Sequence, residues 1–88
     1  MLWTTRLSSE AEKQLSLLPR DLQQRIGDAI DQMGNDPFRG NVKPLKGREW
    51  KGRYRKAVGR YRLIFTPYYS EHRIEISQIL IRSEKTYR

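Results

Sequence analysis

The chain of 88 residues has no cysteine and a single histidine, His72. Without cysteine it can form neither a disulfide nor a thiolate metal site, and one histidine cannot build a histidine cluster. No apolar run approaches the about 20 residues that a membrane helix needs, and the amino terminus lacks the apolar core of a signal peptide. We therefore expect one soluble, unprocessed domain over residues 1–88 in the cytoplasm, with no cofactor and no membrane partner.

The familiar catalytic motifs are also missing. The sequence contains no phosphate-binding Walker loop, no dinucleotide-binding glycine pattern, no His-Glu-x-x-His and no serine nucleophile motif. Phosphate chemistry that needs no metal remains open, because the 2′-hydroxyl of RNA can attack its own phosphate. A protein then has only to align the strand, neutralise the charge that develops and move protons.

Positive charge is abundant, and it is confined to one part of the chain. Residues 1–36 hold four basic and six acidic side chains, whereas residues 37–88 hold fourteen basic and four acidic ones. A field of one sign on one half of a small domain attracts a polyanion. We expect RNA to bind basic residues of the second half, namely Lys43, Lys46, Arg48, Lys51, Arg53, Lys56 and Arg60.

Periodicity and breakers predict an α+β fold, in which a two-helix hairpin packs on one face of a mostly antiparallel four-stranded sheet in the order β-α-α-β-β-β. Ser9, with Glu12 three residues later, has capping-box spacing at the start of the first helix, and Pro19 divides the two helices. The last strand is apolar on both faces, which is typical of an interior strand. The expected elements are a strand over 1–7, helices over 10–17 and 20–33, a loop over 39–52, a hairpin over 53–65, a turn over 66–71 and a strand over 72–82.

The hairpin organises the rest of the chain. Two alternating runs meet at Gly59-Arg60, a two-residue connection of the kind that tight hairpins use. With a period of two, Tyr61, Leu63 and Phe65 form the better buried face. Arg62, and Arg55 across the hairpin, are then expected on an open surface. Their guanidinium groups match phosphate oxygens and keep their charge at any working pH.

These motifs resemble a known family. The residues that carry the resemblance are Leu45-Lys-Gly47, Tyr54 with Arg55, the run from Val58 to Phe65, Arg82 and Tyr87, and together they resemble the RelE/ParE superfamily of bacterial toxins. The resemblance implies a RelE-like, microbial-RNase-like fold. For RelE-like members it also implies a ribosome-dependent mRNA endonuclease that is neutralised by a cognate antitoxin, in an assembly of toxin and antitoxin.

The resemblance places catalytic roles at Arg55, Arg62, Arg82 and Tyr87. Ala57 departs from the pattern, because RelE has a second basic residue there that is thought to help in acid-base chemistry. Arginine is a poor base, so the proton acceptor remains open among Lys46, Lys51, Glu49 and Tyr87. Two alternatives also remain: a ParE-like inhibitor of DNA gyrase without nuclease activity, and a non-catalytic module that binds RNA or the ribosome.

Overall fold

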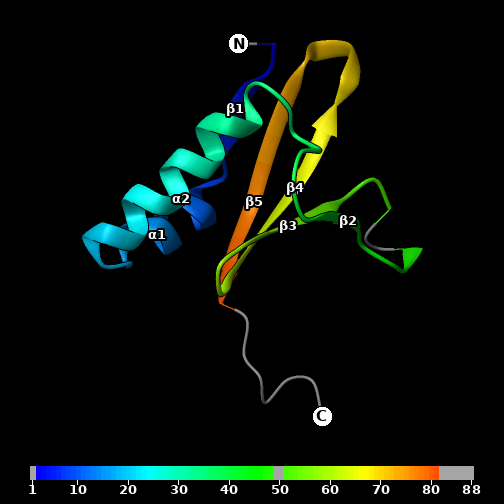
Figure 1. Cartoon of the computed structure of the whole chain (residues 1–88). Helices are drawn as coiled ribbons and strands as arrows, with labels where there is room; N and C mark the ends of the chain where they lie inside the picture. The colour runs from blue at the N-terminus through cyan, green and yellow to red at the C-terminus, as the bar shows by residue number, and fades with distance from the viewer. Residues whose placement is uncertain (1, 49–50, 82–88) are drawn as a thin grey trace.

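A computed structural model describes residues 2–48 and 51–81 of the chain (Figure 1). The described residues form two helices and five strands. In chain order they are β1 (Thr4–Leu7), α1 (Ser9–Ser16), α2 (Arg20–Met33), β2 (Val42–Pro44), β3 (Tyr54–Val58), β4 (Tyr61–Tyr68) and β5 (Arg73–Ile81), with a short 3-10 turn over Tyr69–Glu71. Within the described residues, neither helix is long and apolar enough to cross a membrane.

Both helices form where the apolar spacing predicts them, but the first begins one residue early. Ser8, not Ser9, is the N-cap of α1, because its hydroxyl oxygen accepts the N–H of Ala11 at 3.0 Å. The same hydroxyl donates to the carbonyl of Ser77 at 2.8 Å. Position 8 therefore caps the helix and also ties it to β5, a long-range contact that local capping-box spacing does not reveal.

The sheet has five strands, not the four expected, in the order β1-β5-β4-β3-β2. The additional strand is β2, which lies inside the expected loop and pairs antiparallel with β3. The sheet is mostly antiparallel as expected, although β1 pairs with β5 in parallel. β5 lies between β1 and β4 and is an interior strand, as expected. Its isoleucines Ile74, Ile76 and Ile79 nevertheless all join one core cluster, because the pairing with β4 skips Ser77 and so returns Ile79 to the face of Ile74 and Ile76.

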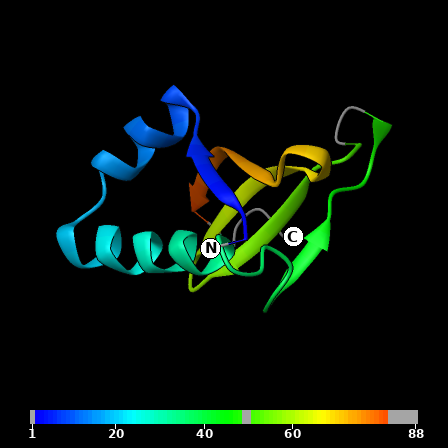
Figure 2. The same cartoon turned by 90° about the horizontal axis from the view of Figure 1, so that it is seen from above.

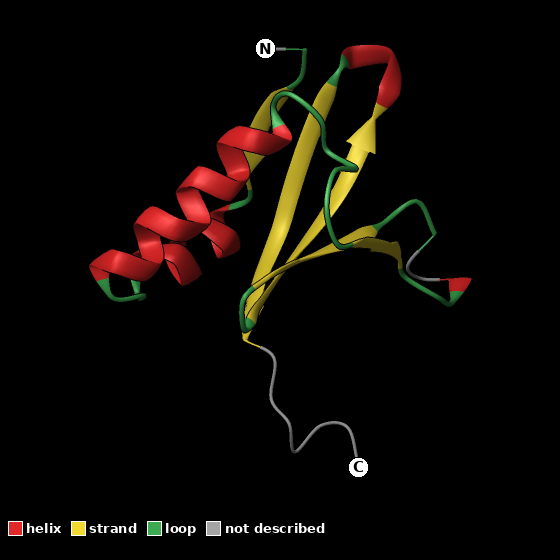
Figure 3. Ribbon diagram, viewed as in Figure 1, coloured by secondary structure: helices red, strands yellow, loops and turns green. Residues whose placement is uncertain are grey.

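The hairpin of β3 and β4 forms as predicted, with its turn at Gly59 and Arg60. The strand β4 is longer than expected, since it continues through Pro67 to Tyr68 instead of ending at Phe65. Proline is tolerated there because the β3 pairing stops at Phe65, so β4 has a partner on one side only. With increasing distance from the hairpin turn, β3 and β2 twist away from β4 and β5 (Figure 3).

The core lies between the helices and one face of this sheet (Figure 2). Leu63 and Phe65 of β4 are fully buried in the same cluster as Ile26, Ile30 and Met33 of α2. Tyr61 is partly buried and packs against that cluster, as the predicted face requires. We call the opposite face of the sheet, turned away from the helices, the outer face.

Candidate nucleic-acid interface

The outer face carries the arginines that the sequence singles out. Residues paired across neighbouring strands point to the same face, and alternate residues along a strand point to opposite faces. Since Leu63 and Phe65 belong to the core, Arg62 and Ile64 belong to the outer face. Arg62 pairs with Ala57 and Ile64 pairs with Arg55, which places Arg55 on the outer face as well.

Arg55 and Arg62 are diagonal neighbours on adjacent strands, a relationship that puts their Cα atoms about 7–8 Å apart. On the other side of Arg55, β2 contributes Lys43 as its direct partner. Three cationic side chains from three adjacent strands therefore lie on one patch, which we call the basic patch. All three lie outside the core cluster, and Lys43 is exposed.

Five other predicted RNA-binding residues lie around this patch. Lys46, Arg48 and Lys51 are exposed in the loop between β2 and β3, and Arg53 is exposed just before β3 begins. Arg60 is exposed in the hairpin turn, two residues before Arg62. They give the patch a positive surround that extends from the β2–β3 loop to the hairpin turn.

Lys56 does not belong to the basic patch. It pairs with Leu63 on the helix side of the sheet, is 8% exposed, and donates a hydrogen bond of 2.6 Å from Nζ to the carbonyl of Arg39. Burial lowers the pKa of its ammonium group, an effect that Asp36 opposes and Arg39 adds to. Lys56 therefore holds the α2–β2 connection in place. Its burial on the helix side of the sheet contradicts the expectation that it binds RNA.

Three residues of the sequence hypothesis, Glu49, Arg82 and Tyr87, fall outside the described residues. Arg82 follows directly after β5, whose last pair joins Tyr61 and Ile81 beside the hairpin turn. The described part of β5 therefore ends at the end of the sheet where Arg62 lies.

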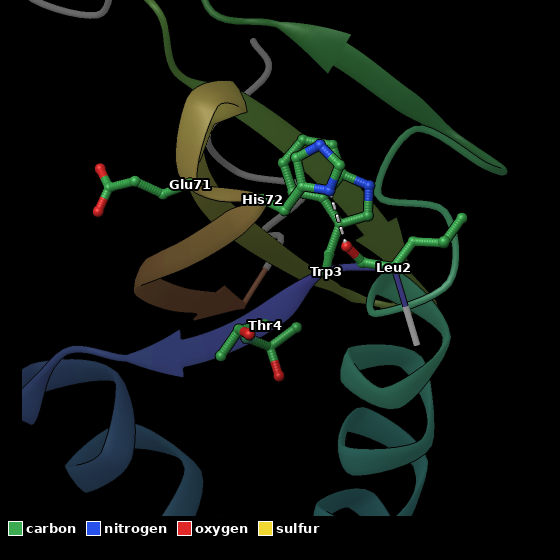
Figure 4. A pocket seen from close by; sticks show the side chains of 6 residues that line it. Leu2, Trp3, Thr4, Glu71 and His72 are labelled. Atoms are coloured by element: carbon green, nitrogen blue, oxygen red, sulfur yellow. Dashed lines mark hydrogen bonds between the residues drawn. The ribbon is translucent and has the colours of Figure 1, made fainter.

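His72 lies far along the sheet from the hairpin turn and, as expected of a residue beside a turn, it is exposed. It lines a pocket with Leu2, Trp3 and Glu71 (Figure 4). Its ring stacks on Trp3 with centroids 5.1 Å apart, and its Nδ1 lies 3.1 Å from the Leu2 carbonyl oxygen. These contacts fasten the amino terminus to the β4–β5 connection, and no predicted site residue takes part in them.

Sequence reasoning missed two arginines on the outer face. Arg6 of β1 pairs with Glu75, and Arg73 of β5 pairs with both Thr4 and Tyr68. Alternation along each strand is the signal that could have placed them. That signal is useful only once the pairing of β1 with β5 is known.

Comparison with known proteins identifies the family. The family model for the ParE toxin of the type II toxin-antitoxin system, parDE, matches residues 4–86. The chain belongs to this toxin family. It is therefore the toxin of a type II toxin-antitoxin system. A search of curated proteins found no match.

Solved structures similar to this ParE-family toxin show the same fold. They include the RelBE2 toxin-antitoxin complex of Mycobacterium tuberculosis, with 24% identity, a TM-score of 0.83 and coverage of 93% of this chain and 100% of that one. The RelE-RelB complex of Pyrococcus horikoshii OT3 has 23% identity and a TM-score of 0.82, and the match covers 96% of this chain and 99% of that one. The YoeB/ParE toxin of Agrobacterium tumefaciens has 19% identity and a TM-score of 0.76, and the match covers 91% of this chain and 99% of that one. These structures span RelE, YoeB and ParE names, so their shared fold leaves the molecular target of this toxin open.

Proposed function

We propose that this toxin is an endoribonuclease that cleaves mRNA on the ribosome, with the 2′-hydroxyl of the RNA as nucleophile. The observation that supports this proposal is the diagonal placement of Arg55 and Arg62 on the outer face, with Lys43 beside Arg55. Guanidinium groups donate paired hydrogen bonds to phosphate oxygens, so two arginines on adjacent strands suit one phosphate group.

In this reaction the 2′-oxygen forms a bond to the adjacent phosphorus, and the bond from phosphorus to the 5′-oxygen breaks. The proton of the 2′-hydroxyl passes to a base, and a proton is supplied to the departing 5′-oxygen. Negative charge grows on the non-bridging oxygens, where Arg55 and Arg62 would stabilise it. Arg82, the next residue in the sequence after β5, would add a third guanidinium.

The proton acceptor must be a residue other than Arg55 or Arg62. A guanidinium stays protonated, so Arg55 and Arg62 cannot serve. Lys46 and Lys51 are exposed in the loop beside the basic patch, while Glu49 and Tyr87 come from the sequence hypothesis alone. Tyr87 would either stack on a base of the message or transfer a proton.

We also propose the partners and the setting. Because relatives of the same fold are solved as RelE-RelB and YoeB-YefM complexes, a cognate antitoxin is expected to bind this toxin and form a hetero-oligomer with it. The ribosome and its mRNA would be the target, and the cytoplasm the place of action. A segment of antitoxin with net negative charge would compete with RNA for the basic patch.

The direct test is single-turnover cleavage of a defined message, bound to ribosomes or free, by the purified toxin. The wild type should cut the bound message. Arg62→Ala should lose about 100- to 1000-fold in rate, as expected for the loss of one preorganised donor to a developing oxyanion. Arg62→Lys should recover only part of the rate because it keeps the charge and loses the fork.

Arg20→Ala is the matched control, because Arg20 is an exposed arginine at the start of α2. Melting temperatures should show that each variant is folded. An intact message after incubation with wild-type toxin would refute the nuclease, and wild-type rates in folded Arg62→Ala would remove Arg62 from the mechanism.

A second candidate, inhibition of DNA gyrase, is favoured by one feature of the outer face. Ala57 lies directly opposite Arg62, at the position where the RelE pattern has a second basic residue. A toxin that binds a protein target would need no base there. Inhibition of gyrase-catalysed supercoiling by the wild type, without cleavage of ribosome-bound message, would establish this alternative.

A further inference from the structure

The outer face carries a second group of cationic and aromatic side chains, far from the hairpin turn. Tyr68 of β4 pairs with Arg73 of β5, which in turn pairs with Thr4 of β1. In the next row, Thr66 pairs with Glu75, which pairs with Arg6. Tyr68 lies six positions after Arg62 in β4, which corresponds to about 20 Å along the strand.

Arg73 and Tyr68 form a stacked pair. The guanidinium carbon of Arg73 lies 4.5 Å from the centroid of the Tyr68 ring, and Tyr68 is 37% exposed. The Nε of Arg73 is buried with no hydrogen-bond partner, and its Nη1 lies 3.6 Å from the Glu71 carboxylate. The pair therefore places an aromatic ring and a guanidinium group together on the outer face, where the Tyr68 ring is partly open to solvent.

A strip without strand cations lies between this pair and the basic patch. Between Arg62 and Tyr68, β4 places Ile64, which is 5% exposed, and Thr66 on the outer face. β5 adds Gln78 opposite Ile64, and the Gln78 amide donates to the carboxylate of Glu10 in α1 at 3.4 Å. Among the described residues of the strands, the cations on this face are Lys43, Arg55, Arg62, Arg6 and Arg73, and the only carboxylate is Glu75. A strand with regularly spaced negative charge can cross this face from one cationic group to the other.

We propose that Tyr68, Arg73 and Arg6 form a subsite for unpaired nucleotides of the RNA, several positions from the phosphate held by Arg55 and Arg62. A base would stack on Tyr68 and the Arg73 guanidinium, and Arg6 would contact a phosphate. This inference rests on the proposed function, because it assumes that the basic patch receives RNA. It extends the contact surface from the cleaved position to the flanking message.

Stacking, more than charge, distinguishes RNA from an acidic peptide at this subsite. Glu75 beside Arg6 and Glu71 beside Arg73 reduce the positive field there, so carboxylates of a peptide gain little. Every base has a π-face that can use an aromatic ring and a guanidinium plane. A base therefore gains a contact that an acidic side chain does not.

The test is the binding of a fluorescently labelled single-stranded RNA of twelve nucleotides, with a 2′-O-methyl group on every ribose so that it cannot be cleaved. Tyr68→Ala should raise the Kd by about 5- to 150-fold, the range for loss of one stacked base. Tyr68→Phe should bind within about twofold of the wild type, because the ring remains. Arg6→Gln should reduce the log-log salt slope by about 0.7, the value for one single-strand phosphate contact.

Arg20→Gln, on the helical side of the domain, is the matched control for Arg6→Gln and should leave the slope unchanged. The subsite would be overturned if folded Tyr68→Ala bound RNA with wild-type affinity and folded Arg6→Gln showed the wild-type salt slope. Weaker RNA binding by Arg62→Ala in the same experiment would leave the proposed function standing. If Tyr68→Ala or Arg6→Gln lost antitoxin binding but kept wild-type RNA binding, the RNA subsite would likewise be overturned. If the wild type cuts no message but Tyr68→Ala still weakens RNA binding, the nuclease fails and the subsite stands.

Discussion

The side-chain oxygen of Gln14 accepts a hydrogen bond of 2.6 Å from the backbone N–H of Ile79, and so joins α1 to β5. The contact lies just after an irregularity in β5, where Ile64 pairs with Gln78 but Phe65 pairs with Ile76. Ser77, skipped in this pairing, is held through its carbonyl by Ser8. The first helix therefore fixes the half of β5 that runs beside Arg62.

Gln14→Leu should destabilise the fold. The substitution removes the acceptor of the Ile79 N–H, and Ile79 is 5% exposed, so the amide would be left without a partner. We expect a loss of about 1–3 kcal/mol in the free energy of unfolding, measured by urea denaturation. Gln24→Leu is the control, because the Gln24 amide donates only to the exposed Asp28 on the same helix. Equal midpoints for the two variants would show that the contact between Gln14 and Ile79 does not stabilise the fold.

Replacing glycine by alanine should have opposite effects at two positions. Gly59, in the hairpin turn, has φ of +59°, a left-handed conformation that costs a residue with a Cβ roughly 1–2 kcal/mol. Gly27 lies within α2, and nothing is within 4 Å of the place where its Cβ would stand. Gly59→Ala should therefore destabilise the protein, whereas Gly27→Ala should stabilise it by about 0.5–1 kcal/mol. Shifts of the same sign in urea midpoint would contradict this expectation.

The sequence predicts the elements in which a strong local pattern and the tertiary structure agree. The hairpin has clear alternation and a glycine at its turn, and α2 has apolar residues at helical spacing. The three residues of β2 have neither signal, since Val42-Lys43-Pro44 is too short to show alternation and ends in a proline. Their strand conformation comes from pairing with β3, a contact that local propensity does not encode.

The candidate site divides in the same way. Arg55 and Arg62 could be placed on one face from period two alone, because both lie in one hairpin. Arg6 and Arg73 come together only through the parallel pairing of β1 with β5, which joins opposite ends of the sequence. Alternation along the strand is enough to place Lys56 on the face opposite Arg55, but it could not reveal the carbonyl of Arg39 that accepts a hydrogen bond from its ammonium group.

The stability conferred by Lys56 should depend on pH. Burial lowers the pKa of its ammonium from the ordinary value of 10.5, so between the lowered pKa and 10.5 the unfolded chain binds more protons than the folded one. Stability should then rise with pH across that interval, because raising the pH removes a proton that the folded state holds weakly. The free energy of unfolding of the wild type relative to Lys56→Met should increase as the pH rises towards 10.5.

Urea denaturation at several pH values measures this difference. Lys46→Met is the matched control, because Lys46 is exposed in the loop and loses no buried contact. A difference between wild type and Lys56→Met that stays constant with pH, or falls as pH rises, would contradict the prediction.

Ala57→Lys should increase the rate of RNA cleavage if a proton acceptor limits the reaction. Position 57 lies on the outer face directly opposite Arg62, and the nearby guanidinium charge would favour the neutral amine of a lysine there. A positioned base contributes about 100- to 10,000-fold, so even poor alignment should raise the single-turnover rate at saturating toxin by about tenfold. Ala57→Met has a side chain of similar length without the amine and should give no increase. An unchanged rate in folded Ala57→Lys would show that the acceptor lies elsewhere, and cleavage by neither variant nor wild type would favour the gyrase alternative.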